Sequence, residues 1–437
     1  MEGNSVNRFK EILKVFTNYG LGYLLGKKED KIRNSPANLR KAFEELGPTF
    51  IKIGQILSTR PELVHEEYIV ELSKLQDNVP TESFEEMAQV FYNEFSKKIE
   101  DEFLFIDKNP IASASVAQAY RGVLKSGKDV VIKIQRPNIK EKMEIDFDIL
   151  LNLSEKFSKI FKDSVVNPKE ILLEIKSATE KELNFNFEAE NIEKFKFLNK
   201  DIPCIYAPYI IKEYTGNKVL TLESIDGFKI NDKESIEILG YDKEDIARKL
   251  TVSYFKQVLK DGFFHGDPHP GNILIRDGQI CFIDFGIVGE LSEEKQRELN
   301  SAIAAVANED VDKLTDFVMS IGIKSGKVDR ELLYKDIEYI FRNYYTTSLK
   351  NIKISVLFQE ISSIAKRNNL RLASDFTMLI RTMVIVEGLV TELSPDLNII
   401  SLVIPYVKDY YKEYFLSQFD ANDYLLKGYK LTRDTLN

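Results

Sequence analysis

Three side chains that could hold a metal ion and a nucleotide lie close together in residues 263–286, FFHGDPHPGNILIRDGQICFIDFG. They are Asp267, Asn272 and Asp284. A magnesium-nucleotide site needs one group that accepts or orients a proton and two oxygen donors that hold the metal against the phosphates. The segment itself reads as loop, short strand, turn and strand. This spacing predicts phosphoryl transfer or ATP hydrolysis.

Two of the three histidines of the chain, His265 and His269, lie in the same segment. Their spacing of four would suit two metal ligands on a helix, but Pro268 and Pro270 disfavour a helix there. We therefore expect both histidines to shape the loop around Asp267 rather than to bind a metal.

Composition narrows the class of protein. The 437 residues are too many for one compact core and fit two or three packed units. An apolar content of 43% with 30% charged residues is typical of a globular protein, and the net charge of −9 argues against nucleic acid as the main partner. Cys204 and Cys281 lie far apart, which excludes a disulfide framework and suits a reducing compartment.

The sequence contains no apolar run of the roughly 18 residues that a membrane-spanning helix needs. Its N-terminus, MEGNSVNRFK, lacks the features of a signal peptide. We expect a cytoplasmic protein without a transmembrane helix. Peripheral contact with the inner face of a membrane stays open, through the amphipathic helix predicted over residues 7–25 or the aromatic C-terminal segment around Tyr410 and Tyr414, although core packing is the favoured role for both.

Local signals predict the order of the elements. A helix should begin at Ser35-Pro36, because serine can cap a helix and proline suits its first position. Residues 103–136 alternate as a three-stranded antiparallel sheet with a hairpin turn at Ser126-Gly127. We then expect helices over residues 138–163 and 168–198, a strand pair within residues 205–223, and helices beyond Asp242 except in residues 263–286.

Lys133 lies within VVIKIQ, where it alternates with apolar residues. Taken alone it would most often be an edge residue that points to water. However, a small-residue turn at Ala112–Ser115 precedes it, and Glu188 on a predicted helix and the Asp-Asn-Asp segment come after it. Turn, strand lysine, helical glutamate and acidic segment occur in this order in protein kinases.

Three features depart from an ordinary protein kinase. The turn expected to be rich in glycine reads PIASASVAQAY, and its Cβ atoms stiffen the backbone near the phosphates. The catalytic loop reads His265-Gly266-Asp267 instead of His-Arg-Asp. After Gly286 the chain soon enters a predicted helix, without a long activation segment or Ala-Pro-Glu, so the platform that holds peptide substrates is missing.

With these departures the chain resembles the UbiB family of aarF-domain or ADCK-type atypical kinases, from about residue 38 to about residue 411. The resemblance is carried by LGPTFIKIGQILSTRPELV, ELSKLQDNVP, PIASASVAQAY, VVIKIQRP, KELNFNFEAEN, FFHGDPHPGNILI, FIDFG and TMLIRTMVIVEGLVTELSPDLN. The KxGQ element at Lys52–Gln55 and the alanine-rich turn are its most specific parts.

The resemblance implies a role for each site residue. Lys133 would contact the α- and β-phosphates of ATP or ADP and pair with Glu188. Asp267 would act as the catalytic base or orient water, while Asn272 and Asp284 would bind Mg²⁺, or Mn²⁺ as the alternative metal. The nucleotide would also meet two further segments. The alanine-rich turn would contribute Ile111, Ala112, Ser113, Ala114, Ser115, Val116, Ala117, Gln118 and Ala119, and the hinge that holds the adenine would contribute Leu222 and Glu223.

In the family, the KxGQ residues Lys52 and Gln55 belong to a helical extension that folds across the site. Lys52 is expected to meet a Glu-x-Asp element, which here reads Glu182-Leu183-Asn184. An amide at position 184 can accept a hydrogen bond but carries no charge, so half of the charge pairing is lost.

The implied fold is α+β, an atypical protein-kinase-like fold with two lobes and a helical N-terminal extension. Its expected parts are an amphipathic helix and linker at 1–34, the KxGQ extension at 35–100, the N-lobe at 101–222 and the helical C-lobe at 223–437.

The implied function is a Mg²⁺-dependent ATPase that supports isoprenoid-quinone or related lipid metabolism and does not phosphorylate proteins. Its partners would be a nucleotide and an isoprenoid or quinone-type lipid. Two alternatives stay open. One is a kinase for a small or lipid hydroxyl substrate, because choline and aminoglycoside kinases carry similar HGDxxxxN loops. The other is a nucleotide-switched module that binds lipid or protein without turnover.

Overall fold

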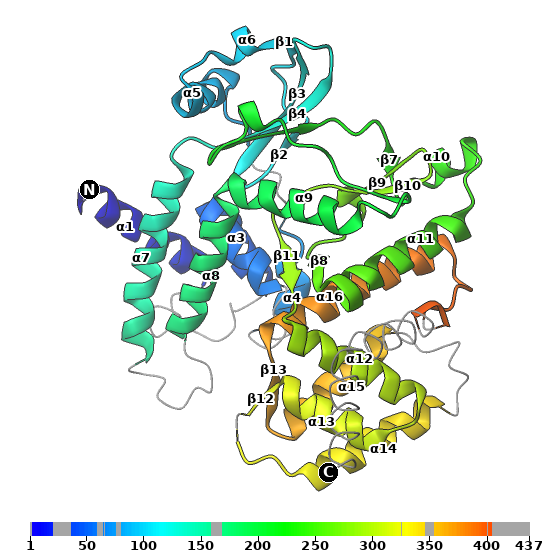
Figure 1. Cartoon of the computed structure of the whole chain (residues 1–437). Helices are drawn as coiled ribbons and strands as arrows, with labels where there is room; N and C mark the ends of the chain where they lie inside the picture. Colours follow the sequence, from blue (N-terminus) through cyan, green and yellow to red (C-terminus); the bar gives the residue numbers. More distant parts are fainter. Residues whose placement is uncertain are drawn as a thin grey trace, which may run out of the picture. The chain divides into compact units, whose positions relative to one another are not determined.

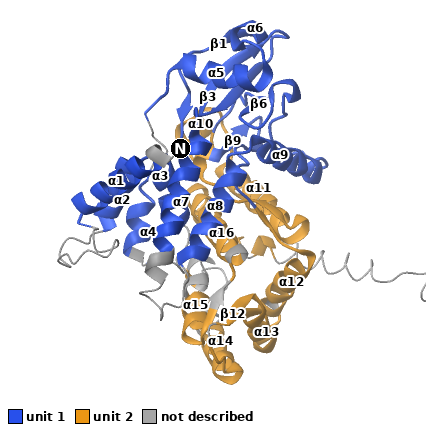
Figure 2. Cartoon of the chain, turned by 90° about the vertical axis from the view of Figure 1, so that its left-hand side faces the viewer, with its two compact units in different colours: residues 1–228, 272–288 blue, residues 229–271, 289–437 orange. Residues whose placement is uncertain are grey.

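The computed structural model describes residues 2–20, 36–58, 64, 66–75, 80–158, 168–324, 326–345, 354–399 and 401–403. The predicted linker before residue 36 and the aromatic C-terminal segment around Tyr410 lie outside these residues. The chain forms two compact units, Met1–Phe228 with Asn272–Val288 and Lys229–Gly271 with Gly289–Asn437 (Figure 2). Each unit contains both helices and strands, which confirms the predicted α+β class.

The first unit begins with the helices of the N-terminal extension. Because a proline occupies the first position, α2 begins at the predicted place. Gly54 on α3 faces Leu75, and an added Cβ would come within 2.2 Å of that side chain, so any larger residue would force the Leu75 side chain to move. The helices are α1 (Glu2–Asn18), α2 (Pro36–Leu46), α3 (Pro48–Ser58) and α4 (Glu66–Leu72).

A sheet of five strands comes next, in the order β1-β3-β4-β6 with β2 also paired to β3. Figure 1 shows the part of this sheet that contains β1 to β4. The sequence predicted a sheet of three strands within residues 103–136. That number of strands was too low, because β2 and the distant β6 join the same sheet. The hairpin at Ser126-Gly127 is confirmed, with Gly127 at a φ of +83°. The strands are β1 (Phe103–Ile106), β2 (Ala112–Ser113), β3 (Ala117–Leu124), β4 (Asp129–Gln135) and β6 (Val219–Glu223).

Helix α5 (Phe84–Phe95) covers this sheet and buries Phe84, Met87 and Phe91 in its core. Its start is set by Ser83 and Glu86, which form a capping box. The short helices α6 (Ile99–Glu102) and η3 (Lys212–Tyr214) precede β1 and β6.

The prediction of a single helix over residues 168–198 is wrong in one respect, because the chain forms two helices there. Asn184 has an extended backbone, and its side chain accepts a hydrogen bond from the backbone N–H of Asn186 at 3.1 Å. This caps a new helix and ends the previous one. The helices of this region are α7 (Ile139–Ser158), α8 (Pro168–Glu182) and α9 (Phe185–Asn199).

The strand pair predicted within residues 205–223 is confirmed only in part. Ile210 forms an isolated antiparallel bridge with Leu222, but the two strands of this region join different sheets. Strand β5 pairs with β10 in parallel, whereas β6 pairs with β4. Strands β9 and β10 form a hairpin whose turn residues, Asp277 and Gly278, both have positive φ. The second sheet contains β5 (Ile205–Tyr206), β10 (Gln279–Phe282), β9 (Ile273–Arg276) and, at the boundary between the units, β7 (Phe228–Lys229).

The second unit is mostly helical, as predicted, but not entirely. Strands β12 (Gly322–Lys324) and β13 (Leu370–Leu372) form an antiparallel pair that the sequence did not predict. The short strand β8 (Phe263–His265) comes after a π-helical turn at Gln257–Asp261, and β11 (Val288–Glu290) pairs with β8. The helices are α10 (Lys233–Ile238), α11 (Lys243–Lys256), α12 (Glu293–Ala307), α13 (Val311–Ile321), α14 (Arg330–Tyr345), α15 (Ile354–Arg367) and α16 (Ser374–Leu393).

Among the helices of the described residues, none is both long and apolar enough to cross a lipid bilayer.

Candidate nucleotide site

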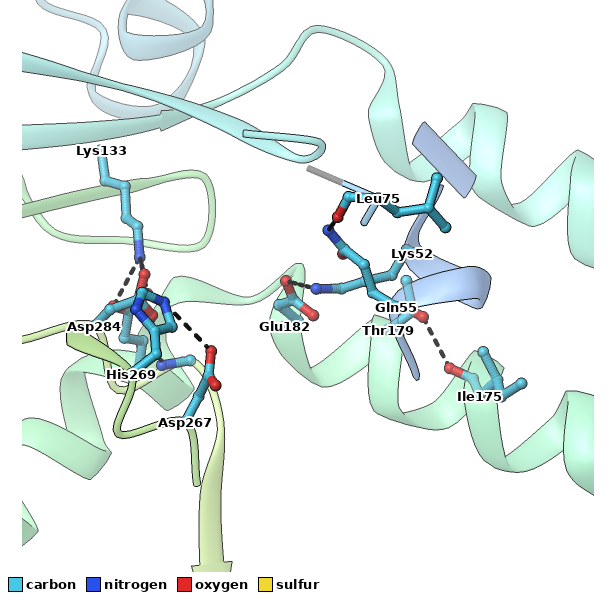
Figure 3. Close-up of polar contacts among 12 residues, drawn as sticks. Lys52, Gln55, Leu75, Lys133, Ile175, Thr179, Glu182, Asp267, His269 and Asp284 are labelled. Carbon is cyan, nitrogen blue, oxygen red and sulfur yellow. Dashed lines mark hydrogen bonds and ion pairs between the residues drawn. The ribbon is translucent and has the colours of Figure 1, made fainter. Parts of the chain in front are cut away.

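Strand β4 directs Lys133 away from the apolar core that its neighbours Ile132 and Ile134 enter. Its Nζ lies 2.9 Å from both carboxylate oxygens of Glu188 on α9. It also lies 3.1 Å from Oδ2 of Asp284 (Figure 3). The structure therefore brings together three of the predicted site residues, which are 55 and 151 positions apart in the sequence.

Burial changes the ionisation of this cluster. The side chain of Glu188 is 5% exposed, and burial raises the pKa of Glu188 to about 7 although Lys133 acts in the opposite direction. Burial also disfavours the charged form of Lys133, but the negative charges of Asp284 and Glu188 outweigh it, so the pKa of Lys133 is above its ordinary value. Lys133 is therefore a cation shared by two carboxyl groups.

The two predicted metal ligands lie at the same end of the β9–β10 hairpin. Asn272 precedes β9, and its backbone carbonyl accepts a hydrogen bond from the N–H of Ile283 at 2.9 Å, next to Asp284. Asp284 has a φ of +59°, which L-residues rarely adopt, and its Oδ1 accepts a hydrogen bond from the N–H of Gly286. Carboxylate and amide oxygens are the donors that Mg²⁺ prefers, so these residues fit that ion.

Helix α9 supports this end of the hairpin as well as Glu188. The side-chain amide of Asn191 donates to the backbone carbonyl of Phe285 at 3.0 Å, and the buried ring of Phe285 packs on Phe195 with ring centroids 4.8 Å apart. One helix thus positions both carboxylates that contact Lys133.

The alanine-rich turn is a tight hairpin. Ala112 and Ser113 pair with β3, and the N–H of Ala114 donates to the carbonyl of Ala117 at 2.9 Å. Ile111 and Ala112 are exposed, whereas the other end of the turn is buried, namely Ser115, Val116, Ala117 and Gln118. The amide of Gln118 contacts the Tyr120 hydroxyl at 2.6 Å.

The predicted hinge lies at the end of β6, where Glu223 is held by several groups. Its carboxylate accepts hydrogen bonds from the Tyr206 hydroxyl at 2.6 Å and from Arg276 at 2.9 Å. The Arg276 guanidinium also stacks on the Tyr206 ring at 4.0 Å. Sequence reasoning missed Tyr206 and Arg276, since neither belongs to a recognisable motif.

The KxGQ residues lie on α3. Nζ of Lys52 is 2.5 Å from a carboxylate oxygen of Glu182 on α8, and the Gln55 amide donates to the backbone carbonyl of Leu75 at 3.4 Å (Figure 3). The lysine side chain is only 10% exposed. Asn184, in place of the second carboxylate, caps α9.

The remaining predicted residue, Asp267, belongs to the second unit. The fully buried His265 shapes its loop, because Nδ1 of His265 accepts a hydrogen bond from the N–H of Asp267 at 3.2 Å. The backbone carbonyl of His265 accepts from the Tyr254 hydroxyl at 3.0 Å, and its N–H donates to the side chain of Gln257 at 3.1 Å. His265 is thus a structural residue of the loop.

Both carboxylate oxygens of Asp267 have a basic neighbour. Nη2 of Arg381 on α16 lies 3.4 Å from Oδ1, and Nε2 of His269 lies 3.7 Å from Oδ2. Arg381 was not among the predicted site residues, although it belongs to the late stretch TMLIRTMVIVEG that carries part of the family resemblance. Within the described residues, no group of three or more His, Cys, Asp or Glu side chains could hold a metal ion.

Comparison with known proteins gives two family matches. Residues 74–318 match the ABC1 atypical kinase-like domain, and residues 337–398 match the UbiB helical domain. The second match contains Arg381.

Three relatives show how far the similarity extends. A Clostridium pasteurianum protein described as an uncharacterized protein in the hydrogenase 1 5′ region is 49% identical over 99% of this chain and 82% of its own length. The chloroplastic protein ACTIVITY OF BC1 COMPLEX KINASE 7 of Arabidopsis thaliana is 31% identical over 89% of this chain, which spans 56% of that protein. A probable protein kinase UbiB of Histophilus somni is 29% identical over 94% of this chain and 81% of its own length.

A solved structure has the same fold. It is that of a Mycobacterium tuberculosis protein in complex with erythromycin, with a TM-score of 0.57 and 22% identity over 82% of this chain and 92% of that chain. The kinase-like fold is thereby confirmed. Because the match to the ABC1 domain covers more than half of the chain, the chain belongs to the ABC1/UbiB family of atypical kinases.

Proposed function

We propose that this protein is a Mg²⁺-dependent ATPase whose ATP hydrolysis is coupled to the handling of an isoprenoid, quinone-type or related lipid. The observation that carries the nucleotide part is the contact of Lys133 with both Glu188 and Asp284 at 2.9 to 3.1 Å. A half-buried, ion-paired lysine beside an aspartate that can bind a metal is the arrangement with which kinases hold ATP phosphates.

The short connection after Gly286 favours hydrolysis over protein phosphorylation. The chain passes through β11 and reaches the N-cap of α12, Ser292, within six residues. That length leaves no room for an activation segment, on which kinases dock peptide substrates. In addition, Lys52 of the extension is fixed by Glu182.

Each of the residues that the family resemblance assigns has a defined task in the proposed reaction. Lys133 places its positive charge on the α- and β-phosphates, and Glu188 keeps the lysine in position. Asp267 accepts a proton from the attacking water, and Arg381 keeps the Asp267 carboxylate oriented. Asn272 and Asp284 supply oxygen ligands for Mg²⁺, which, when bound, neutralises charge on the phosphate oxygens.

The lipid part of the proposal is supported by family resemblance. A UbiB relative aligns with 94% of this chain. The apolar face of helix α1 packs within the first unit, where Ile12, Val15 and Phe16 are buried, so the lipid part rests on the family resemblance alone.

Phosphate release from purified protein tests the proposal, with and without vesicles that contain an isoprenoid quinone. We expect Asp267→Asn to lower the rate by about 100-fold or more. Asp277→Asn is the matched control, because it makes the same chemical change in the turn of the β9–β10 hairpin, where asparagine also tolerates positive φ. The control should retain the wild-type rate.

Equal background rates in wild type and Asp267→Asn would exclude the ATPase and favour a nucleotide-switched binding module. Transfer of labelled phosphate from ATP to a lipid or small hydroxyl compound would favour a kinase instead.

A further inference from the structure

We propose that Arg136 is the residue that positions the alanine-rich turn, and that it thereby sets the affinity of the site for ATP relative to ADP. The second clause rests on the proposed nucleotide site, whereas the first stands on contacts within the first unit alone. Arg136 lies directly after β4, three residues beyond Lys133.

Arg136 contacts the turn at three points. Its Nε donates to the backbone carbonyl of Ala114 at 2.9 Å, and its Nη2 donates to Oγ of Ser113 at 2.8 Å. Its backbone N–H donates to the carbonyl of Val116 at 2.9 Å. These three bonds span the bend of the turn and hold both of its arms.

The other edge of the guanidinium contacts the chain that enters from the N-terminal extension. Nη1 donates to the backbone carbonyl of Pro80 at 2.9 Å and to a carboxylate oxygen of Glu82 at 3.2 Å. Gln118 on β3 strengthens this connection, because its Oε1 accepts a hydrogen bond from the N–H of Glu82 at 2.5 Å. Pro80 is the last residue of the LQDNVP stretch, to which neither the sequence nor the proposed mechanism assigns a task.

The position of Arg136 makes these bonds strong. Its side chain is 4% exposed, so the bonds do not compete with bulk water, and a cation donating to carbonyl and carboxylate oxygens forms charge-assisted bonds. A planar guanidinium can serve acceptors on two sides at once, which the single ammonium of a lysine cannot. Arginine is therefore required at this position, not merely a positive charge.

These contacts have two consequences for the phosphate site. Arg136 binds the turn and directly follows β4, the strand that carries Lys133. The turn therefore keeps a fixed position relative to the lysine. The turn is also tied to Pro80 and Glu82, so a displacement of the extension would move the backbone that faces the phosphates. Release of Arg136 would let the turn approach or leave the terminal phosphate, which ATP has and ADP lacks.

Hydrogen–deuterium exchange of the nucleotide-free protein tests the first clause. We expect Arg136→Lys to raise amide exchange in residues 111–119 by about tenfold or more, as expected from the loss of one or two charge-assisted bonds. Ser113→Ala removes a single contact from the side of the turn and should raise exchange there by a smaller factor. Arg121→Lys is the matched control, since Arg121 lies on β3 with an exposed side chain. Unchanged exchange in Arg136→Lys would overturn the proposal.

Calorimetric titration with Mg-ATP and Mg-ADP tests the second clause. We expect the ratio of the two dissociation constants to change by about fivefold or more in Arg136→Lys and in Glu82→Gln, and to stay constant in Arg121→Lys. An unchanged ratio in both variants would overturn it. If wild-type protein binds neither nucleotide, the proposed function fails, whereas the exchange experiment still decides whether Arg136 positions the turn. Ser113→Ala and Glu82→Gln leave the buried arginine in place, so they keep both tests decisive if Arg136→Lys does not fold.

Discussion

Arg381 and Asp267 are 114 positions apart in the sequence, yet Nη2 of the arginine lies 3.4 Å from Oδ1 of the aspartate. The arginine belongs to the UbiB helical domain, whereas the aspartate lies in the loop after β8 within the ABC1 domain. The helical domain therefore contributes directly to the surroundings of the proposed catalytic base. The two side chains are 34% and 26% exposed, so their attraction contributes at most about 1 kcal/mol to folding.

This contact predicts a loss of activity without a loss of stability. We expect Arg381→Gln to lower kcat for ATP hydrolysis by about tenfold or more, because the carboxylate loses the cation that orients it. The free energy of unfolding should change by less than about 1 kcal/mol. Arg330→Gln removes a different arginine of the same unit, one paired with Asp312 and Asp316, and should keep full activity. Wild-type kcat in Arg381→Gln would show that Arg381 has no part in the reaction.

The ion pair of Lys52 with Glu182 predicts that the extension restrains the nucleotide site. We expect Lys52→Ala to change the preference between ATP and ADP or to permit autophosphorylation, measured by nucleotide titration and by incorporation of labelled phosphate. Unchanged nucleotide binding together with no incorporation would contradict this role. Asn184→Asp is an informative companion, because aspartate caps helices as well as asparagine does and restores the second carboxylate of the Glu-x-Asp element.

The pKa of Glu188 predicts how stability depends on pH. The pKa of this buried carboxyl is raised from its ordinary value of 4.5 to about 7, so the folded state binds a proton that the unfolded state releases. Its stabilising contribution is present below pH 4.5 and is lost as pH rises through about 7. Relative to Glu188→Gln, which cannot titrate, the wild type should lose on the order of 3 kcal/mol over this range.

Denaturant unfolding of both proteins at several pH values, with a chelator present, measures this difference. Parallel stability curves for wild type and Glu188→Gln would show that Glu188 does not titrate in this window.

The hinge predicts coupling between Glu223 and Arg276. Their side chains are 12% and 21% exposed and lie 2.9 Å apart, so each stabilises the other more than a surface pair does. In a double-mutant cycle with Glu223→Gln and Arg276→Met, we expect a coupling energy of about 1 to 3 kcal/mol in the free energy of unfolding. We also expect weaker ATP binding in each single variant, because β6 and the hairpin that carries Asn272 and Asp284 lose a direct connection. Additive effects of the two substitutions on the free energy of unfolding would show that the Glu223–Arg276 ion pair does not couple β6 to the hairpin.

Local pattern was sufficient for the elements near the site. The hairpin at Ser126-Gly127, the strand that contains Lys133 and the helix start at Pro36 depend on residues a few positions apart. Turn chemistry, alternation of apolar residues and capping act over that range, so one sequence was enough to predict them. The same holds for the types and order of the candidate site residues, which with the KxGQ element also indicated the family that the comparisons confirmed.

The errors and omissions concern contacts between distant segments. Strand β6 joined β4 and strand β5 joined β10, because strand pairing is decided by which sheet edges meet, and alternation along one strand does not specify its partner. The break before α9 depended on the side chain of Asn184 acting as a cap instead of continuing a helix.

The sequence by itself determined which groups could do chemistry, since carboxylates, amides and lysines at characteristic spacings are chemical facts of the chain. Only the tertiary structure decided which of them meet. Asp284 as a second partner of Lys133, Arg381 beside Asp267, and Arg136 between the turn and Pro80 all depend on the packing of distant elements. Hydrogen bonds and ion pairs form only within about 3 to 4 Å, and such distances between remote residues are fixed by packing and not by local propensity.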